Sequence, residues 1–250
     1  MHFDIFLNKM ENIFLSTVIN NHIPQEDDEY PFDIPVIKYL DTLTFKTSVT
    51  YIIGENGSGK STLLEAIAVK MGMNAEGGGR NFHFSTNETH SDLFKALSIA
   101  KTPYYLHDIY FYRAESFYNA ISYLEGLGDN PFFSYGGKNL HECSHGEGMV
   151  NFFENRLECG FYIFDEPEAA LSYQNQLRFL LWIKNAVTAG SQIIISTHSP
   201  VILAYPKATI LTIGERGLEP TTYEESYIYR DMHAFVNSVP LIQHELGLLD

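Results

Sequence analysis

The stretch "YIIGENGSGKSTLLEAIA", residues 51–68, decides the fold of this chain of 250 residues. It contains the pattern GxxxxGK[ST], and the short apolar run 49–53 predicts a buried strand that leads into it. The residues after the pattern have helical periodicity and end at Gly72, which predicts a helix. A glycine-rich loop between a strand and a helix turns backbone N–H groups inward, where they bind phosphate. The sequence therefore predicts a phosphate-binding loop, or P-loop.

Two side chains add chemistry to this loop. Lys60 is placed to reach the β- and γ-phosphates of a nucleotide, and the Ser61 hydroxyl is a ligand for Mg²⁺. The segment supplies these predicted nucleotide-binding residues: Gly54, Glu55, Asn56, Gly57, Ser58, Gly59, Lys60, Ser61 and Thr62.

A second motif, "FYIFDEPE" at residues 161–168, brings two carboxylates to the end of an apolar run. The run predicts a buried strand, and ligands of open α/β sheets bind where such strands end. We predict Asp165 as a Mg²⁺ ligand and Glu166 as the group that polarises an attacking water. An apolar run that ends in an acidic turn is common by itself, and the P-loop is what favours the functional interpretation.

Two further segments complete a family resemblance. "SHGEG" at 144–148 precedes a helical pattern, and "STHSP" at 196–200 follows an apolar strand pattern. With the P-loop and "FDEPE", these motifs resemble those of ABC-type ATPases in order and spacing, from about Val49 to Pro200. The segment "SHGE" resembles the signature of the SMC, RecF and RecN branch more than that of transporter subunits. The chain is also similar to compact, stand-alone bacterial ATPases with "RAESF" and "DEPEAALS".

The resemblance implies an ATP- and Mg²⁺-dependent ATPase that forms an ATP-dependent homodimer. Ser144, Gly146 and Glu147 would be the signature segment, which in this family caps the nucleotide on a second subunit. His198 would contact the γ-phosphate. The implied catalytic residues are thus Glu166, His198 and Lys60, and the implied metal ligands are Ser61 and Asp165.

The sequence departs from the family pattern at several places. Ser172 stands where many relatives have an aspartate in the loop between subunits. No clear glutamine loop is present, and either Arg113 or Glu115 replaces it or the segment is a plain strand end. The adenine contact is open between a stacking aromatic, Tyr30 or Phe32, and a solvated turn. Between Lys60 and the signature there are no heptads, so the coiled coil of SMC proteins is missing.

The expected fold is α/β: a P-loop NTPase of ABC ATPase-head type, with a mainly parallel sheet flanked by helices and an N-terminal antiparallel β portion. We expect one domain over 1–250, with a P-loop core at about 45–75 and 158–215 and a helical signature insertion at about 75–158. Segments 13–20 and 36–45 are expected to be strands. The glycine-rich segment 74–92 is expected to be a mobile surface loop.

Composition limits the partners. The formal charge of −15 disfavours direct binding to nucleic acid. The two cysteines, Cys143 and Cys159, lie in no metal-binding pattern, and no apolar run is long enough for a membrane span, so we expect a cytoplasmic protein without direct membrane insertion. An unidentified protein partner is expected. A slow nucleotide switch, the engine of a membrane transporter and an ATPase of DNA maintenance stay open as roles.

Overall fold

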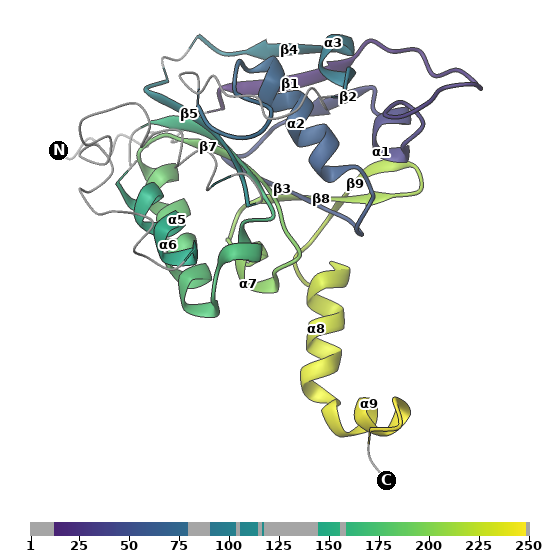
Figure 1. The fold of residues 1–250 in the computed structure, drawn as a ribbon, viewed down its shortest axis with the longest axis vertical. Helices are drawn as coiled ribbons and strands as arrows, with labels where there is room; N and C mark the ends of the chain where they lie inside the picture. Colours follow the sequence, from purple (N-terminus) through teal and green to yellow (C-terminus); the bar gives the residue numbers. More distant parts are fainter. Residues whose placement is uncertain are drawn as a thin grey trace, which may run out of the picture.

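The computed structural model describes residues 13–79, 91–103, 106–114, 117, 145–155 and 159–248. In this part of the chain the larger sheet has six strands in the order β5-β6-β7-β3-β8-β9 (Figure 1). The first five of these are parallel, and β9 pairs antiparallel with β8. Their bounds are β3 (Val49–Ile53), β5 (Asp108–Arg113), β6 (Gly160–Asp165), β7 (Gln192–Ser196), β8 (Thr209–Gly214) and β9 (Gly217–Thr221). The expected mainly parallel sheet is confirmed.

A smaller antiparallel sheet has the order β2-β1-β4, with β1 at Leu15–Asn20, β2 at Thr42–Thr44 and β4 at Leu97–Lys101. It confirms the N-terminal antiparallel portion. The prediction of one strand over 36–45 is wrong, because α1 (Pro35–Lys38) precedes β2. Proline at the first helical position favours a helical turn, and periodicity cannot separate a short buried helix from a strand.

The helices cover both faces of the larger sheet (Figure 1). On one side, α2 (Lys60–Lys70) and α3 (Leu93–Ala96) pack with the smaller sheet; on the other lie α5 (His145–Glu154), α6 (Tyr173–Thr188) and α7 (Pro200–Leu203). The strand β3 shows why both faces of the sheet must be covered by other elements. Its Ile52 packs toward α2, whereas Tyr51 and Ile53 pack toward the opposite core. Strands buried on both faces read as continuous apolar runs.

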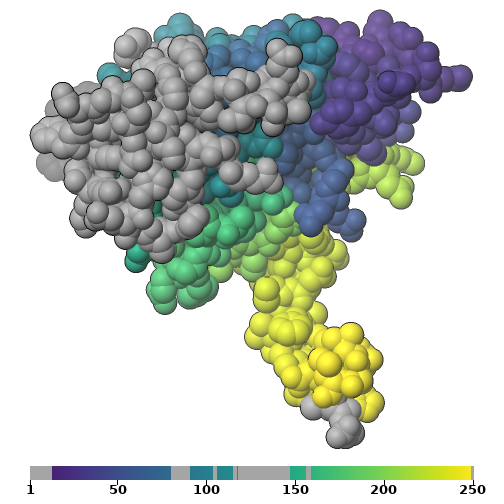
Figure 2. Space-filling view, viewed as in Figure 1, coloured from purple at the N-terminus to yellow at the C-terminus, as the bar shows by residue number. Residues whose placement is uncertain are grey.

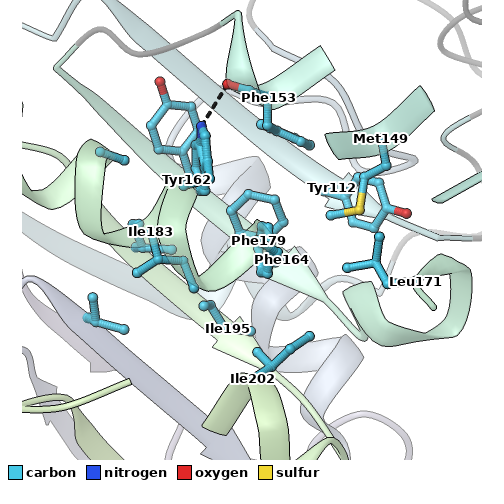
Figure 3. Close-up of a cluster of buried hydrophobic side chains, with 14 of the residues drawn as sticks. Tyr112, Met149, Phe153, Tyr162, Phe164, Leu171, Phe179, Ile183, Ile195 and Ile202 are labelled. Atoms are coloured by element: carbon cyan, nitrogen blue, oxygen red, sulfur yellow. Dashed lines mark hydrogen bonds between the residues drawn. The ribbon is translucent and has the colours of Figure 1, made fainter. Parts of the chain in front are cut away.

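The core under α5 and α6 is rich in aromatic side chains (Figure 3). Phe164 of β6 contacts Phe153, Phe179 and Trp182 in edge-to-face geometry, with ring centroids 4.8 to 5.4 Å apart. The indole nitrogen of Trp182 donates a hydrogen bond of 2.6 Å to the Phe153 carbonyl. These contacts fix β6 against two helices, so that the carboxylates at its end are held by a rigid element.

One buried side chain joins the two sheets. The Oε1 atom of Gln192, at the start of β7, accepts hydrogen bonds of 2.8 Å from the backbone of both Phe14 and Leu15. Its Nε2 atom donates to the Leu15 carbonyl at 3.0 Å. The N-terminal strand is therefore hydrogen-bonded to the central sheet through a glutamine that is 1% exposed.

The glycine-rich segment after α2 differs from the expected surface loop where it is described. Residues 77–79 are buried, and Gly78 exchanges backbone hydrogen bonds with Phe111 of β5. Gly77 and Gly78 both have positive φ angles, which glycine adopts at little cost. The glycines thus allow a close approach to the edge strand. Residues 80–90 lie outside the described part of the chain.

The last two helices, α8 (Tyr227–Asn237) and α9 (Val239–Glu245), leave the body of the molecule (Figures 1 and 2). The one buried residue of α8 is Ile228, in its first turn. We call α8 and α9 the arm. Its exposed apolar side chains include Met232, Phe235, Val236 and Leu241. Among the described residues, every helix is too short or too polar to cross a membrane.

Candidate nucleotide site

The carboxyl ends of the parallel strands bring the predicted site residues to one edge of the sheet. In the strand register Arg113 of β5 lies opposite Asp165 of β6, and Asp165 lies opposite Ser196 of β7. Ser196 in turn lies opposite Ile52 of β3, two residues before Gly54. Because β7 separates β3 from β6, the P-loop and the two carboxylates face each other across one strand.

The P-loop has the backbone conformation that its glycines predict. Gly57 and Gly59 have φ angles of 79° and 93°, and Gly59 is the residue that precedes the first turn of α2. A Cβ atom on Gly59 would lie 2.7 Å from Val36 and 2.9 Å from Ile34, both in the segment of α1. The loop is therefore packed closely from outside, and its free N–H groups and the α2 N-terminus suit an anion.

Lys60 lies inside this loop and is 4% exposed. Its ammonium donates to the carbonyl oxygens of Gly54 at 2.8 Å and Glu55 at 3.0 Å, and lies 3.7 Å from Glu166 Oε1. Burial lowers the pKa of Lys60, and the nearby carboxylates of Glu166 and Asp165 oppose that shift. The side chain is thus held by the loop at the position from which a lysine contacts phosphate.

Ser61 and Asp165 fit the magnesium ion that the resemblance implies. Burial raises the pKa of Asp165, while hydrogen bonds from Ser196 and Ser61 oppose the shift. The bond from Ser196 Oγ is 2.6 Å long. A hydroxyl and a carboxylate in contact are hard oxygen ligands, and Mg²⁺ takes its remaining ligands from phosphate and water. Among the described residues, no group of three or more His, Cys, Asp or Glu side chains is arranged to hold a metal ion.

Glu166 has an unusual backbone. Its φ of 50° and ψ of 56° are in the left-handed region, which residues other than glycine seldom adopt. Its N–H reaches both the carbonyl and the hydroxyl oxygen of Ser196, each at 3.1 Å. Its Oε1 lies 3.3 Å from His198 Nε2. The strained turn therefore points the carboxylate between Lys60 and His198, beside the expected phosphate position.

The loop that carries His198 is fixed by Glu168, a residue that the sequence analysis did not single out. The Glu168 carboxylate accepts hydrogen bonds from Thr197 Oγ1, at 2.8 Å, and from the backbone N–H of His198. Burial raises the pKa of Glu168, and these two bonds oppose the shift. Glu168 is the second glutamate of "DEPE", but Thr197 and His198, which donate to it, are about thirty residues further along the chain. Within the described residues, His198 Nε2 makes no hydrogen bond, although it is buried.

A cleft of about 230 Å³ opens beside the P-loop and is lined by Tyr30, Ile34, Asn56, Gly57, Gly59, Lys60, Ser61, Thr62 and Glu166. Of the two aromatic residues considered for adenine, Tyr30 lies at this cleft, 64% exposed, with its hydroxyl 3.2 Å from Thr62 Oγ1. Phe32 instead stacks on His22, with ring centroids 4.0 Å apart. Of these two residues Tyr30 lines the cleft, whereas the ring of Phe32 packs against His22.

The predicted signature segment is not part of this cluster. Ser144 lies outside the described residues. Gly146 and Glu147 are in the first turn of α5, where Glu147 is exposed. This helix packs against α6, across the sheet from α2. The helix α2 that follows the P-loop and the helix α5 therefore cover different faces of the sheet (Figure 1).

Two of the departures from the family pattern have a structural role. Ser172 caps the N-terminus of α6 and accepts from the Asn175 N–H at 3.4 Å. Arg113 donates to Glu65 of α2 at 2.9 Å and lies 3.9 Å from Asp165 Oδ2. Arg113 therefore joins α2 to Asp165 at the end of β6, a role that a plain strand end would not have. Glu115 lies outside the described residues.

The strand, P-loop and helix, with the carboxylates of the neighbouring strand beside them, have the arrangement of a nucleotide-binding P-loop domain. Two segments match models of known families: residues 37–109 match an AAA domain, and residues 149–204 match an AAA domain described as a putative AbiEii toxin of a type IV toxin–antitoxin system. The first match contains the P-loop, and the second contains Asp165, Glu166 and His198. Both matches agree with the predicted resemblance.

Solved structures with a similar chain path include a putative metal-chelate type ABC transporter in an inward-facing conformation, with a TM-score of 0.48 and 13% identity over 90% of this chain and 89% of that one. The SMC head domain from Thermotoga maritima has a TM-score of 0.44 and 16% identity, over 84% of this chain and all of that domain (100%). No curated protein matches the sequence.

Proposed function

We propose that this chain hydrolyses ATP with Mg²⁺, and that two copies enclose two ATP molecules. The observation that carries the proposal is the convergence of Lys60, Ser61, Asp165, Glu166 and His198 at the ends of three neighbouring strands. Lys60 and the P-loop N–H groups bind the β- and γ-phosphates, and Mg²⁺, when bound by Ser61 and Asp165, neutralises phosphate charge. Glu166 orients and polarises the attacking water, while His198 Nε2, 3.3 Å from Glu166 Oε1, contacts the γ-phosphate.

A second copy supplies the remaining side of the site in this proposal. The nucleotide cleft of one chain is open, and two of the predicted signature residues, Gly146 and Glu147, begin α5, which covers the face of the sheet opposite α2. A serine hydroxyl and glycine N–H at the start of a helix would bind the γ-phosphate of a partner's ATP. An ATP-dependent dimer of this kind changes shape with the nucleotide and so acts on a further protein. The acidic charge of −15 disfavours nucleic acid as that target.

The variant Glu166→Gln tests the proposal. It keeps the shape of the side chain but removes the negative charge that polarises water. We expect it to bind ATP like the wild type, to lose phosphate release by at least about 100-fold, and to accumulate a dimer in ATP. Phosphate release and light scattering after size exclusion measure these effects. Glu219→Gln, on the exposed side of β9, is the control. Wild-type turnover in Glu166→Gln would refute Glu166 as the base, and a wild-type chain that binds no ATP would refute the function.

A further inference from the structure

Tyr227, the first residue of α8, lies against the nucleotide site although no motif includes it. Its hydroxyl oxygen is 3.4 Å from Nδ1 of His198. The backbone of Gly54, at the entrance of the P-loop, lies close to this hydroxyl. The ring lines a second cleft, of about 470 Å³, on the side of the P-loop formed by Glu55, Ser58 and the end of β8. One phenol thus contacts both the phosphate-binding loop and the histidine loop.

The groups on the two sides of the imidazole favour one direction for this hydrogen bond. Nε2 faces Oε1 of Glu166 at 3.3 Å, and a carboxylate only accepts, so a neutral ring carries its proton on Nε2 rather than turn a lone pair toward the carboxylate. Nδ1 is then the acceptor, and the Tyr227 O–H donates to it at 3.4 Å. Burial raises the pKa of Tyr227, which keeps the phenol protonated and able to donate at neutral pH. A histidine whose Nδ1 accepts a hydrogen bond carries its ring proton on Nε2.

That proton is on the nitrogen that faces the reaction. His198 Nε2 points toward Glu166, 3.3 Å from its Oε1, and makes no hydrogen bond among the described residues. An Nε2–H donates to a phosphate oxygen, whereas the other neutral form of the ring presents a lone pair and repels it. The identity of the tautomer therefore decides whether His198 stabilises negative charge at the γ-phosphate.

Tyr227 is also held rigidly enough to select this form. Ser226, which is 2% exposed, caps α8 by accepting from the Tyr229 N–H at 3.2 Å, and its hydroxyl donates to the Tyr223 carbonyl at 2.6 Å. On the other side of Tyr227, Ile228 is buried in the core. A capped first turn and a buried neighbour fix the position of the phenol before any nucleotide binds.

We propose that Tyr227 is a positioning residue that fixes the orientation and the Nε2–H tautomer of His198, and so links the arm to the ATP site. The inference rests on the proposed ATPase function. It adds a contact from a residue outside the sequence motifs, so that the first turn of α8 takes part in the recognition of the γ-phosphate.

The kinetic test uses Tyr227→Phe, which removes the hydroxyl and keeps the ring. We expect kcat to fall about five- to tenfold, as for the loss of one neutral hydrogen bond, with KM and the melting temperature unchanged. Tyr223→Phe is the matched control, because its hydroxyl donates to the Pro200 carbonyl at 3.0 Å in the same loop without touching the imidazole. An equal loss in the control, or none in Tyr227→Phe, would overturn the inference.

A double-mutant cycle with His198→Gln shows whether Tyr227 acts through the histidine. In the His198→Gln background, Tyr227→Phe should cause no further loss of kcat, because its target is already absent. The same loss in both backgrounds would mean that the hydroxyl acts independently of His198, and the inference would fail.

A spectroscopic test needs no turnover and separates this inference from the proposed function. The ¹⁵N shifts of the imidazole report the tautomer at about pH 8.5, two units above the usual histidine pKa. The signal of His198 is assigned by its loss in His198→Gln. We expect the Nε2–H form in the wild type and in Tyr223→Phe, and a mixture in Tyr227→Phe. If the chain hydrolyses no ATP but the tautomer shifts as expected, only the proposed function fails; an unchanged tautomer overturns the inference.

Discussion

At the scale of the residue, the site depends on backbone conformations that most side chains avoid. Gly57 and Gly59 need positive φ angles to curl the P-loop, and Glu166 adopts one despite its Cβ atom. The Glu166 conformation costs about 1–2 kcal/mol, which its neighbours must offset. Ser196 does so in part, because both of its oxygen atoms lie within hydrogen-bonding distance of the Glu166 N–H. Strain and function coincide at this one position of the sheet edge.

The variant Gly59→Ala tests the packing outside the P-loop. The new methyl group would meet Val36 and Ile34 and would impose a positive φ angle on alanine. We expect a loss of about 2–4 kcal/mol in the free energy of unfolding and a strong loss of ATP affinity, measured by urea titration and by fluorescence of a labelled nucleotide.

Gly72→Ala provides the matched control for that variant. Gly72 also has a positive φ angle, of 86°, but a Cβ atom there would meet nothing within 4 Å. It should lose only about 1–2 kcal/mol and bind ATP normally. Equal effects of the two substitutions on ATP affinity would show that crowding by α1 does not shape the loop.

The sequence predicts those residues of the site whose role is local. Lys60, Ser61 and the P-loop glycines act through one turn of chain, and a pattern over eight residues is enough to recognise them. Ser196, Glu168 and Tyr227 act through partners that are about thirty residues or more distant in the chain. Nothing in their neighbouring residues indicates those partners, so only the fold could show them.

At the scale of the element, the smaller sheet depends on a side chain rather than on strand pairing for its link to β7. Gln192 satisfies the backbone N–H groups of both Phe14 and Leu15, as well as the Leu15 carbonyl. A glutamine in an apolar strand pattern is easily read as a solvent-facing position. The three hydrogen bonds of its side chain explain why β7 tolerates a buried polar residue at its first position.

Replacement of this link measures its contribution to stability. Gln192→Met keeps the length of the side chain but removes the hydrogen-bond partner of three backbone groups, of which the two on Leu15 are buried. We expect a loss of about 2–4 kcal/mol in the free energy of unfolding, obtained from urea denaturation. The control Gln174→Met changes an exposed position of α6 and should stay within about 0.5 kcal/mol. A loss below about 1 kcal/mol in Gln192→Met would mean that water replaces the lost partners.

Elements next to the motifs are the best predicted from the sequence, because short apolar runs lead into the P-loop and into the acidic turn. The strands β3, β6 and β7 and the helix α2 lie close to their expected positions. The wrong predictions fall in segments where apolar residues or glycines form short elements. Segment 36–45 divides into α1 and β2, and the glycines of 77–79 are buried against β5.

At the scale of the whole molecule, α2, which follows the P-loop, and α5, which begins with the predicted signature residues Gly146 and Glu147, cover different faces of the larger sheet. The proposed dimer would pair each P-loop with the partner's signature segment. It predicts that every working site contains residues of two chains.

Mixing of two inactive variants tests this arrangement. Lys60→Ala removes ATP binding, and Gly146→Asp places a negative charge where the partner's γ-phosphate is expected. Each variant alone should release little phosphate, whereas their mixture should regain activity, because a mixed dimer contains one site with neither substitution. A mixture that forms mixed dimers but stays inactive would contradict a shared site.

The arm has a mechanical consequence. α8 has eleven residues, and at about 1.5 Å per residue it is a rod about 16 Å long that is embedded only at its first turn. A load on α9 would act on this rod as on a lever with its fulcrum beside Tyr227. Hydrogen bonds weaken over a few tenths of an ångström, so a tilt of a few degrees at the fulcrum is enough to loosen the phenol from the imidazole. The ATP site would then sense force as well as ligand: traction on the arm should slow hydrolysis while leaving ATP bound.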